Sequence, residues 1–252
     1  LGVVVQALGT LPRSDSLGLL RERAPGLKDA PDAGLEALAE RLGDLPLALD
    51  LAGGYLDEMK VVSPQAFLDE ISKEGGALEH TALRDWAESN PTEHEINLAA
   101  TFMLSWKQLD DTQELARKLF EATGYLAPNI PIPRSIFEAL GGNPGATALA
   151  LRPLIRLGLL KDTLSVHRLL AEFARSQDGK HAVLGELVDK MARECKRANE
   201  TGIPAEFAPL RPHLEALAPL AEQAGLPDAS DLWGNLGYHQ NMVAEYNAAR
   251  IT

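Results

Sequence analysis

The sequence contains two short segments whose residue types could contact a ligand. The first is G-D-L-P-L-A at residues 43–48, which places Pro46 where a helix is expected to begin. A proline in the first helical turn loses no hydrogen bond, and its ring presents a flat apolar face without a competing donor. Such a ring suits packing against an adenine base, although an ordinary helix start also explains the segment.

The second segment is V-H-R-L-L at residues 166–170, in which His167 precedes an expected helix. A histidine at this point can donate a hydrogen bond to a phosphate, and the positive end of the helix dipole favours the negative charge. The alternative is a partly buried histidine that only caps the helix. Both alternatives stay open from the residues themselves.

Other catalytic and metal-binding patterns are absent from the sequence. No G-x-x-x-x-G-K-[ST] segment occurs, and the glycine cluster at residues 141–145 lacks the lysine that would meet a phosphate. There is no H-E-x-x-H, no G-x-S-x-G and no cysteine pair, and the six histidines are scattered. We therefore predict no catalytic residues and no metal site, and the chain is not expected to be an enzyme on its own.

Composition limits the classes of partner and compartment. The 252 residues are 45% hydrophobic, enough for a core divided among two or three small domains. The 36 acidic and 24 basic residues give a formal charge of −12, which disfavours binding to nucleic acid or anionic membranes. The single cysteine, Cys195, fits a reducing compartment, and no apolar run reaches the roughly 20 residues needed to cross a bilayer. We predict a cytoplasmic protein.

The first part of the chain is predicted to change from strand to helix. Residues 1–10 resemble the terminal strand of a sheet whose other strands lie upstream, which suggests that the chain is a fragment. Residues 11–76 show helical spacing of leucines, with Asp44 as the expected N-cap of the helix that begins near Pro46. Residues 77–94 are polar and are predicted to be a linker.

Residues 95–180 are predicted to form one domain of helices with a small hairpin. Helices are expected at about 96–106, 111–124, 136–140, 146–157 and 167–175. Residues 159–166 suggest two very short strands joined by a tight turn. The last three helices before the hairpin, the hairpin itself and the helix after it have the order of a winged-helix domain.

Residues 181–252 show the pattern of antiparallel helix pairs. Trp233, Leu236 and Gly237, with Ala249 twelve residues further on, have the spacing of a tetratricopeptide repeat. Such residues more often form the core of a repeat than a ligand site. The predicted fold class is therefore mainly α: a helical lid, a winged helix with a short hairpin, and helical repeats.

These motifs together resemble the NB-ARC family of STAND signalling ATPases. The segment R-L-G-D-L-P-L-A-L-D-L-A-G-G-Y-L at residues 41–56 resembles the family's G-L-P-L-A segment, and V-H-R resembles its M-H-D motif. The order of elements over about residues 1–180 is also similar to that of the family's ARC helical and winged-helix subdomains. This sequence differs in Asp44, which lies between Gly43 and Leu45, and in Val166 and Arg168, which replace Met and Asp.

The resemblance implies a regulatory function. In the family, the proline contacts the nucleotide base and the histidine bonds the β-phosphate of ADP, so Pro46 and His167 are the expected cofactor-binding residues. Bound ADP would keep the protein closed, and exchange for ATP would allow opening and homo-oligomerisation. Mg²⁺ would bind only together with the missing nucleotide-binding domain, and the repeats would bind a protein partner.

Two other functions are compatible with parts of the pattern. The first is a helical interaction scaffold that never contacts a nucleotide. The second is DNA binding by the winged helix. Residues 95–180 contain ten Lys or Arg and nine Asp or Glu, and this nearly neutral balance disfavours DNA.

Overall fold

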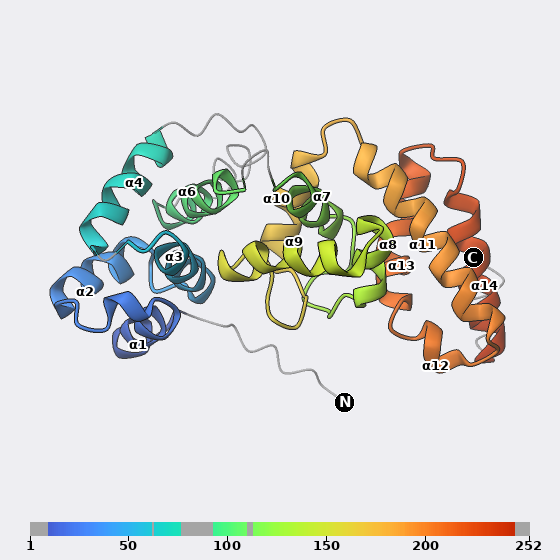
Figure 1. Cartoon of the computed structure of the whole chain (residues 1–252), viewed down its shortest axis with the longest axis horizontal. Coiled ribbons are helices and arrows are strands. Elements are labelled where there is room, and N and C mark those ends of the chain that lie inside the picture. The colour runs from blue at the N-terminus through green and yellow to red at the C-terminus, as the bar shows by residue number, and fades with distance from the viewer. Residues whose placement is uncertain (1–9, 62, 77–92, 110–112, 245–252) are drawn as a thin grey trace. The chain divides into compact units, whose positions relative to one another are not determined.

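The computed structural model consists of helices grouped in two compact units (Figure 1). It describes residues 10–61, 63–76, 93–109 and 113–244. Thirteen α-helices and one 3₁₀ helix lie in these ranges, and none of the described residues is in a strand. The prediction of a mainly helical fold is confirmed. The strand predicted at residues 1–10 and the linker at 77–94 lie almost wholly outside the described residues.

The first unit comprises residues up to Gln108 together with Arg156–Gly158. Its helices are α1 (Arg13–Arg23), η1 (Pro25–Leu27), α2 (Asp32–Arg41), α3 (Pro46–Glu58), α4 (Pro64–Gly76) and α6 (Glu93–Lys107). Helix α3 is central, because it packs against both α1 and α6 and eight of its thirteen residues are buried. A Cβ added at Gly53 would lie 2.5 Å from the Cβ of Arg23, so the close approach of α1 and α3 requires glycine there.

Helix α6 belongs to the first unit rather than to the second. It packs against α3 and α4, and the division between the units falls after Gln108. The predicted domain boundary between residues 94 and 95 therefore differs from the division of the structure. The apolar face of α6, which includes the buried Phe102, explains this grouping because it joins the core of the first unit.

The second unit comprises the residues from Leu109 to Ile155 and from Leu159 onward. Its helices are α7 (Glu114–Thr123), α8 (Arg134–Gly141), α9 (Pro144–Arg156, whose last residue is grouped with the first unit), α10 (Arg168–Gln177), α11 (Ala182–Glu200), α12 (Pro204–Phe207), α13 (Arg211–Gln223) and α14 (Ala229–Met242). Helix α7 packs on α10, where the rings of Phe120 and Phe173 lie 6.1 Å apart. Helix α11, the longest in the described ranges, contacts α7, α8, α12, α13 and α14.

The hairpin predicted at residues 159–166 is a tight turn without strands. Lys161 N–H donates to the carbonyl of Ser165 at 3.0 Å, and Leu164 N–H donates to the carbonyl of Lys161 at 2.8 Å. Leu164 has a left-handed backbone with φ of 57°, which interrupts extended pairing. Each predicted arm has only three residues, too few to form a ladder once one of them turns away.

The same turn also bonds to the proline-rich connection before α8. Asn129 N–H donates to the carbonyl of Val166 at 2.8 Å, and Ile132 N–H donates to the carbonyl of Leu164 at 3.1 Å. These carbonyls therefore have partners outside the predicted hairpin. The connection from α7 to α8 thus holds the turn that leads into α10.

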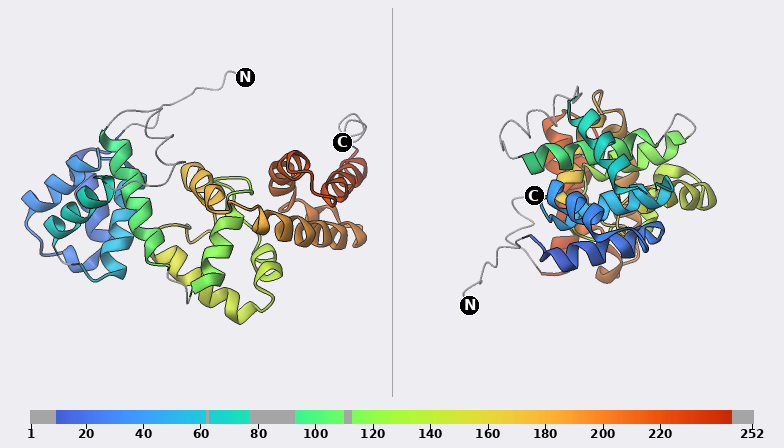
Figure 2. Two further views of the ribbon diagram at one scale, coloured as in Figure 1. Left: turned by 90° about the horizontal axis from the view of Figure 1, so that it is seen from above. Right: turned by 90° about the vertical axis from the view of Figure 1, so that its left-hand side faces the viewer.

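The C-terminal helices α11, α13 and α14 lie side by side (Figures 1 and 2). Leu236 on α14 is buried, whereas Trp233 is only half-buried. Ala249, the last residue of the predicted repeat pattern, lies outside the described residues. Among the helices in the described ranges, none combines the length and the apolar character that a membrane crossing requires.

Candidate functional site

Pro46 is the first residue of α3 and its side chain is exposed. The preceding residue, Leu45, is the N-cap, with an extended backbone and no side-chain capping bond. The prediction that Asp44 caps this helix is wrong. Gly43 and Asp44 both have left-handed backbones, with φ of 67° and 51°, and this reversal turns the Asp44 carboxylate away from the first turn of α3.

The Asp44 carboxylate instead binds Arg13 on α1. Arg13 Nε donates to Oδ1 at 3.0 Å and Nη2 donates to Oδ2 at 2.8 Å, a two-point ion pair. Arg13 also donates to the carbonyl of Glu36 on α2 at 2.8 Å, and Leu11 N–H donates to the carbonyl of Asp44 at 2.9 Å. The backbone that presents Pro46 is therefore fixed by contacts with α1 and α2. The two charges are evident in the sequence, but their ion pair is not, because it depends on the left-handed backbone at residues 43 and 44.

His167 is the N-cap of α10 and is half-buried. Its Nδ1 accepts a hydrogen bond from Leu169 N–H at 3.3 Å. Burial lowers the pKa of His167, and the positive charges of Arg168 and Lys161 lower it further. At neutral pH the ring is therefore neutral, and because Nδ1 is an acceptor the proton lies on Nε2.

This arrangement leaves His167 with one donor for a ligand. No hydrogen bond involving Nε2 occurs among the residues that the structure describes. A neutral Nε2–H can donate to a phosphate oxygen, while Arg168 and Lys161 favour an anion nearby. The capping role is observed, and it is compatible with the ligand contact because the two use different nitrogens.

The two predicted contact residues belong to different units. Pro46 lies in the first unit and His167 in the second, so each contact stays a separate prediction. Within the described part of the chain, no group of three or more His, Cys, Asp or Glu side chains is arranged to hold a metal ion. Burial raises the pKa of Cys195 to about 12, so its thiol is not a nucleophile at neutral pH.

A buried polar cluster, which the sequence did not indicate, joins α7 to the start of α11. Tyr125 O–H donates to Asp178 Oδ2 at 3.0 Å, and the same oxygen accepts from Leu184 N–H at 2.9 Å. Burial raises the pKa of nearby Glu121 to about 7, with a further increase from Asp178 and an opposing effect of Arg117. The protonation of this cluster is therefore expected to change near neutral pH. Its contacts connect helices and are those of a structural cluster.

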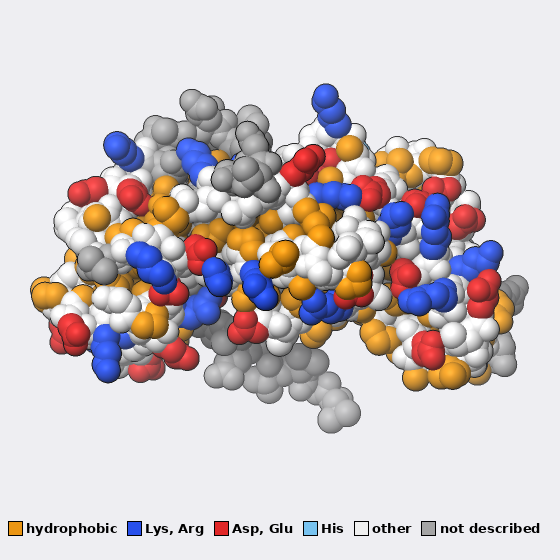
Figure 3. All heavy atoms as spheres, in the orientation of Figure 1, with side chains coloured by type: hydrophobic (Ala, Val, Ile, Leu, Met, Phe, Trp, Pro, Cys, Tyr) orange, Lys and Arg blue, Asp and Glu red, His pale blue; other side chains and the backbone are white. Residues whose placement is uncertain are grey.

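A groove of about 670 Å³ runs between α11 and α14, within the second unit. It is lined by Asp189, Ala192, Arg193, Lys196, Asn199, Glu200, Asp228, Ser230, Asp231, Gly234, Asn235 and Tyr238. Charged side chains of both signs lie over α11 on the face shown in Figure 3. The sequence contained one signal for it, because Asn199 continues the apolar spacing of Met191 and Cys195 and is buried like them.

No family model, curated protein or solved structure matches this chain. The two helix starts and the groove are therefore the features on which a function can be argued.

Proposed function

We propose that this chain is the regulatory part of a STAND-type signalling switch and that it senses ADP or ATP held by a nucleotide-binding domain. The observation that carries the proposal is the state of His167. The ring is neutral, its Nδ1 is fixed by the first turn of α10, and its Nε2–H remains available to a phosphate. The cap itself uses only Nδ1 and needs the neutral ring, so Nε2–H is the donor left for a ligand.

Pro46 supports the same proposal from the first unit. Its ring is exposed although α3 as a whole is deeply buried, and the Arg13–Asp44 pair fixes the backbone next to it. An exposed proline ring on a rigid helix start can pack against a flat base at low entropic cost. We assign it the contact with adenine.

The finer architecture is part of the proposal. Helices α7, α8, α9 and α10 follow the order of a winged helix, with its wing reduced to the turn at 159–166. Helices α11, α13 and α14 form a tetratricopeptide-like arm that binds a protein partner. ADP would hold the lid closed through His167 and Pro46, and exchange for ATP would release it and permit homo-oligomerisation. Such coupling requires about 1–3 kcal/mol of difference in affinity between the two states.

The test compares two histidines that both occupy N-cap positions. His167→Asn keeps a good capping side chain but removes the ring, and His181→Asn is the matched control at the start of α11, where His181 makes no capping bond. In the intact protein that contains the phosphate-binding loop, we expect His167→Asn to reduce the ADP retained after purification about tenfold, the effect of one charge-assisted hydrogen bond. His181→Asn should retain ADP. Equal ADP content in both variants would contradict the proposal.

A second measurement concerns catalysis. Residues 1–252 contain no phosphate-binding loop, so we expect no ATP hydrolysis by the purified chain. Turnover that persists after further purification would show that catalytic residues lie within it.

The alternative function is an interaction scaffold without nucleotide contact. The groove between α11 and α14 favours it, because a partner-binding surface needs no nucleotide. The scaffold is the better account if the intact protein neither retains ADP nor responds to His167→Asn.

A further inference from the structure

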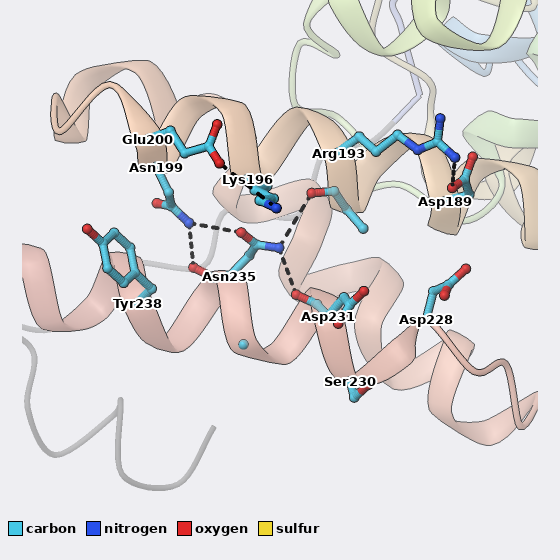
Figure 4. Close-up of a pocket in the computed structure, with 12 residues that line it drawn as sticks. Asp189, Arg193, Lys196, Asn199, Glu200, Asp228, Ser230, Asp231, Asn235 and Tyr238 are labelled. Atoms are coloured by element: carbon cyan, nitrogen blue, oxygen red, sulfur yellow. Dashed lines mark hydrogen bonds and ion pairs between the residues drawn. The ribbon is translucent and has the colours of Figure 1, made fainter.

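The groove between α11 and α14 has a defined direction and length. Asp189 and Asp228 lie at one end, and Asn199 and Tyr238 lie at the other, so the two helices run in the same direction (Figure 4). From Asp189 to Glu200 the α11 wall is about 16 Å long at the rise of an α-helix. This length matches about five residues of extended chain.

Asn199 is an unusual residue in the wall of this groove. Its side chain is 6% exposed. Its Nδ2 donates to the main-chain carbonyl of Asn235 at 3.0 Å and to Asn235 Oδ1 at 3.2 Å. The remaining atom, Asn199 Oδ1, is buried and has no hydrogen-bond partner among the described residues.

An unpaired buried amide oxygen requires an explanation. Leaving it without a donor is unfavourable, because the buried oxygen has lost the hydrogen bonds that water would supply. Exchanging the oxygen and nitrogen of Asn199 would place two oxygens against each other at Asn235, so the observed orientation is the favourable one. Oδ1 therefore lacks an N–H donor, and a ligand in the groove can supply one. Side chains that line a binding surface often change rotamer on binding, and such a change would open the way to Oδ1.

The charges on the two walls differ. On α11, Arg193 pairs with Asp189 at 2.7 Å and Lys196 lies 4.0 Å from Glu200, so each of these cations has an acidic neighbour on its own helix. On the opposite wall, Asp228 and Asp231 make no ion pair within the described part of the chain (Figure 4).

The helix dipole accounts for part of this acidity. Asp228 and Asp231 lie at the N-terminal end of α14, where the dipole favours negative charge. Their position is thus explained by the helix, whereas the unpaired oxygen of Asn199 is not. The unpaired oxygen of Asn199 is therefore the observation that requires a ligand with an N–H donor, and the two acidic side chains favour a ligand that is also positively charged.

We propose that this groove binds an extended, lysine- or arginine-bearing peptide segment of a partner protein. One main-chain N–H of the segment donates to Asn199 Oδ1, and its basic side chains pair with Asp228 and Asp231. The exposed ring of Tyr238 packs on the aliphatic part of a basic side chain. The proposal rests on the partner-binding role assigned above to the helical arm, and it is independent of nucleotide contact.

The first test uses short labelled peptides. The probes are fluorescein-labelled Ala-Lys-Ala-Lys-Ala amide and its glutamate counterpart, and fluorescence polarisation measures their binding to residues 1–252. We expect the lysine peptide to bind at least tenfold more tightly. Asp231→Asn should weaken it about fivefold, whereas Asp162→Asn, the same change at an exposed aspartate outside the groove, should leave binding unchanged.

The second test removes the main-chain donor without changing the protein. Each amide of the lysine peptide is N-methylated in turn, and one position should lose at least tenfold in affinity. In Asn199→Ala the penalty for methylating that position should disappear. If this variant does not fold, the methylation series on the native chain still decides, because equal losses at every position overturn the contact with Asn199.

Other occupants give different results. Preferred binding of the glutamate peptide, or a lysine affinity unchanged by Asp231→Asn, overturns the proposal. If Asp231→Lys converts a dimer into a monomer in sedimentation experiments, the groove is occupied by a second copy of the chain, and the proposal is also wrong. None of these results affects the ADP experiment with His167→Asn, so failure here and failure of the nucleotide switch are distinguishable.

Discussion

Helices α3 and α10 differ in how the N–H groups of their first turns are accommodated. At α3 the first residue is Pro46, which needs no partner for its nitrogen, and no side chain caps the helix. At α10 the side chain of His167 caps the helix directly. The ring of Pro46 is consequently exposed and the ring of His167 is half-buried.

The difference shows which residue is free to serve a ligand. Pro46 contributes little to the helix beyond its backbone, and the Arg13–Asp44 pair fixes the approach to α3. His167 serves its helix through Nδ1 and has only Nε2 left. Changes at His167 should therefore affect stability and binding together, whereas changes at Pro46 should affect binding alone.

Among the changes that test this comparison, Asp44→Ala is expected to have the largest effect on stability. It removes the two-point bond to Arg13 and leaves alanine in a left-handed backbone, so we expect a loss of about 2–3 kcal/mol in the free energy of unfolding. Asp44→Gly removes the same bond without the backbone strain and should lose about 1 kcal/mol less. Urea denaturation measures both. Equal losses would show that the left-handed backbone at residue 44 carries no cost.

Glu121→Gln should alter the pH dependence of stability. The pKa of Glu121 is raised to about 7 in the folded chain, so its contribution is complete below its ordinary value of 4.5 and is lost as the pH rises to about 7. At pH 8 the variant should be more stable by about 1–2 kcal/mol, less than the full shift implies because the carboxyl is partly solvated. At pH 4.5 the two proteins should be equal. Glu172→Gln, at an exposed position on α10, is the control and should show no such pH-dependent gain.

The Glu121→Gln variant also allows the contribution of His167 to the pH dependence of stability to be measured separately. Its pKa is lowered on folding, so its stabilising contribution is complete above about pH 6.5 and is lost as the pH falls below that value. Glu121 acts in the opposite sense over this range, and Glu121→Gln removes that opposition. His167→Asn in this background should reduce the acid-side loss of stability, and some loss should remain from His213, whose pKa burial also lowers. An unchanged pH profile would show that the ring is not held neutral.

The helices were largely predictable from the sequence, because their apolar spacing is regular. The starts of α3 and α4 at Pro46 and Pro64 follow directly from proline's preference for the first turn. The prediction of strands at residues 159–166 was wrong. Whether so short a turn pairs as strands depends on which N–H groups, distant in sequence, bond to its carbonyls. The left-handed conformation of Leu164 has no signal in its residue type.

The candidate site was predictable only in part. The positions of Pro46 and His167 at helix starts follow from local sequence, but the pKa of His167 depends mainly on how deeply the folded chain buries the ring. Asp44 was assigned to the wrong partner because its left-handed backbone turns the carboxylate toward α1. The groove depends on the packing of α11 beside α14, and its one local signal is Asn199 at an apolar position of α11.

The smallest effect on stability is expected from Pro46→Ala, and this makes it the sharpest test of the comparison. Pro144 also begins a thirteen-residue helix with an exposed proline, so Pro144→Ala is its matched control. Each change should alter the free energy of unfolding by less than about 0.5 kcal/mol, because alanine is accepted in the first turn. In the intact protein, Pro46→Ala should nevertheless weaken ADP retention several-fold, and Pro144→Ala should not. A loss of stability at Pro46 alone would mean that its ring supports the fold, and the proposed contact with a base would then have no independent basis.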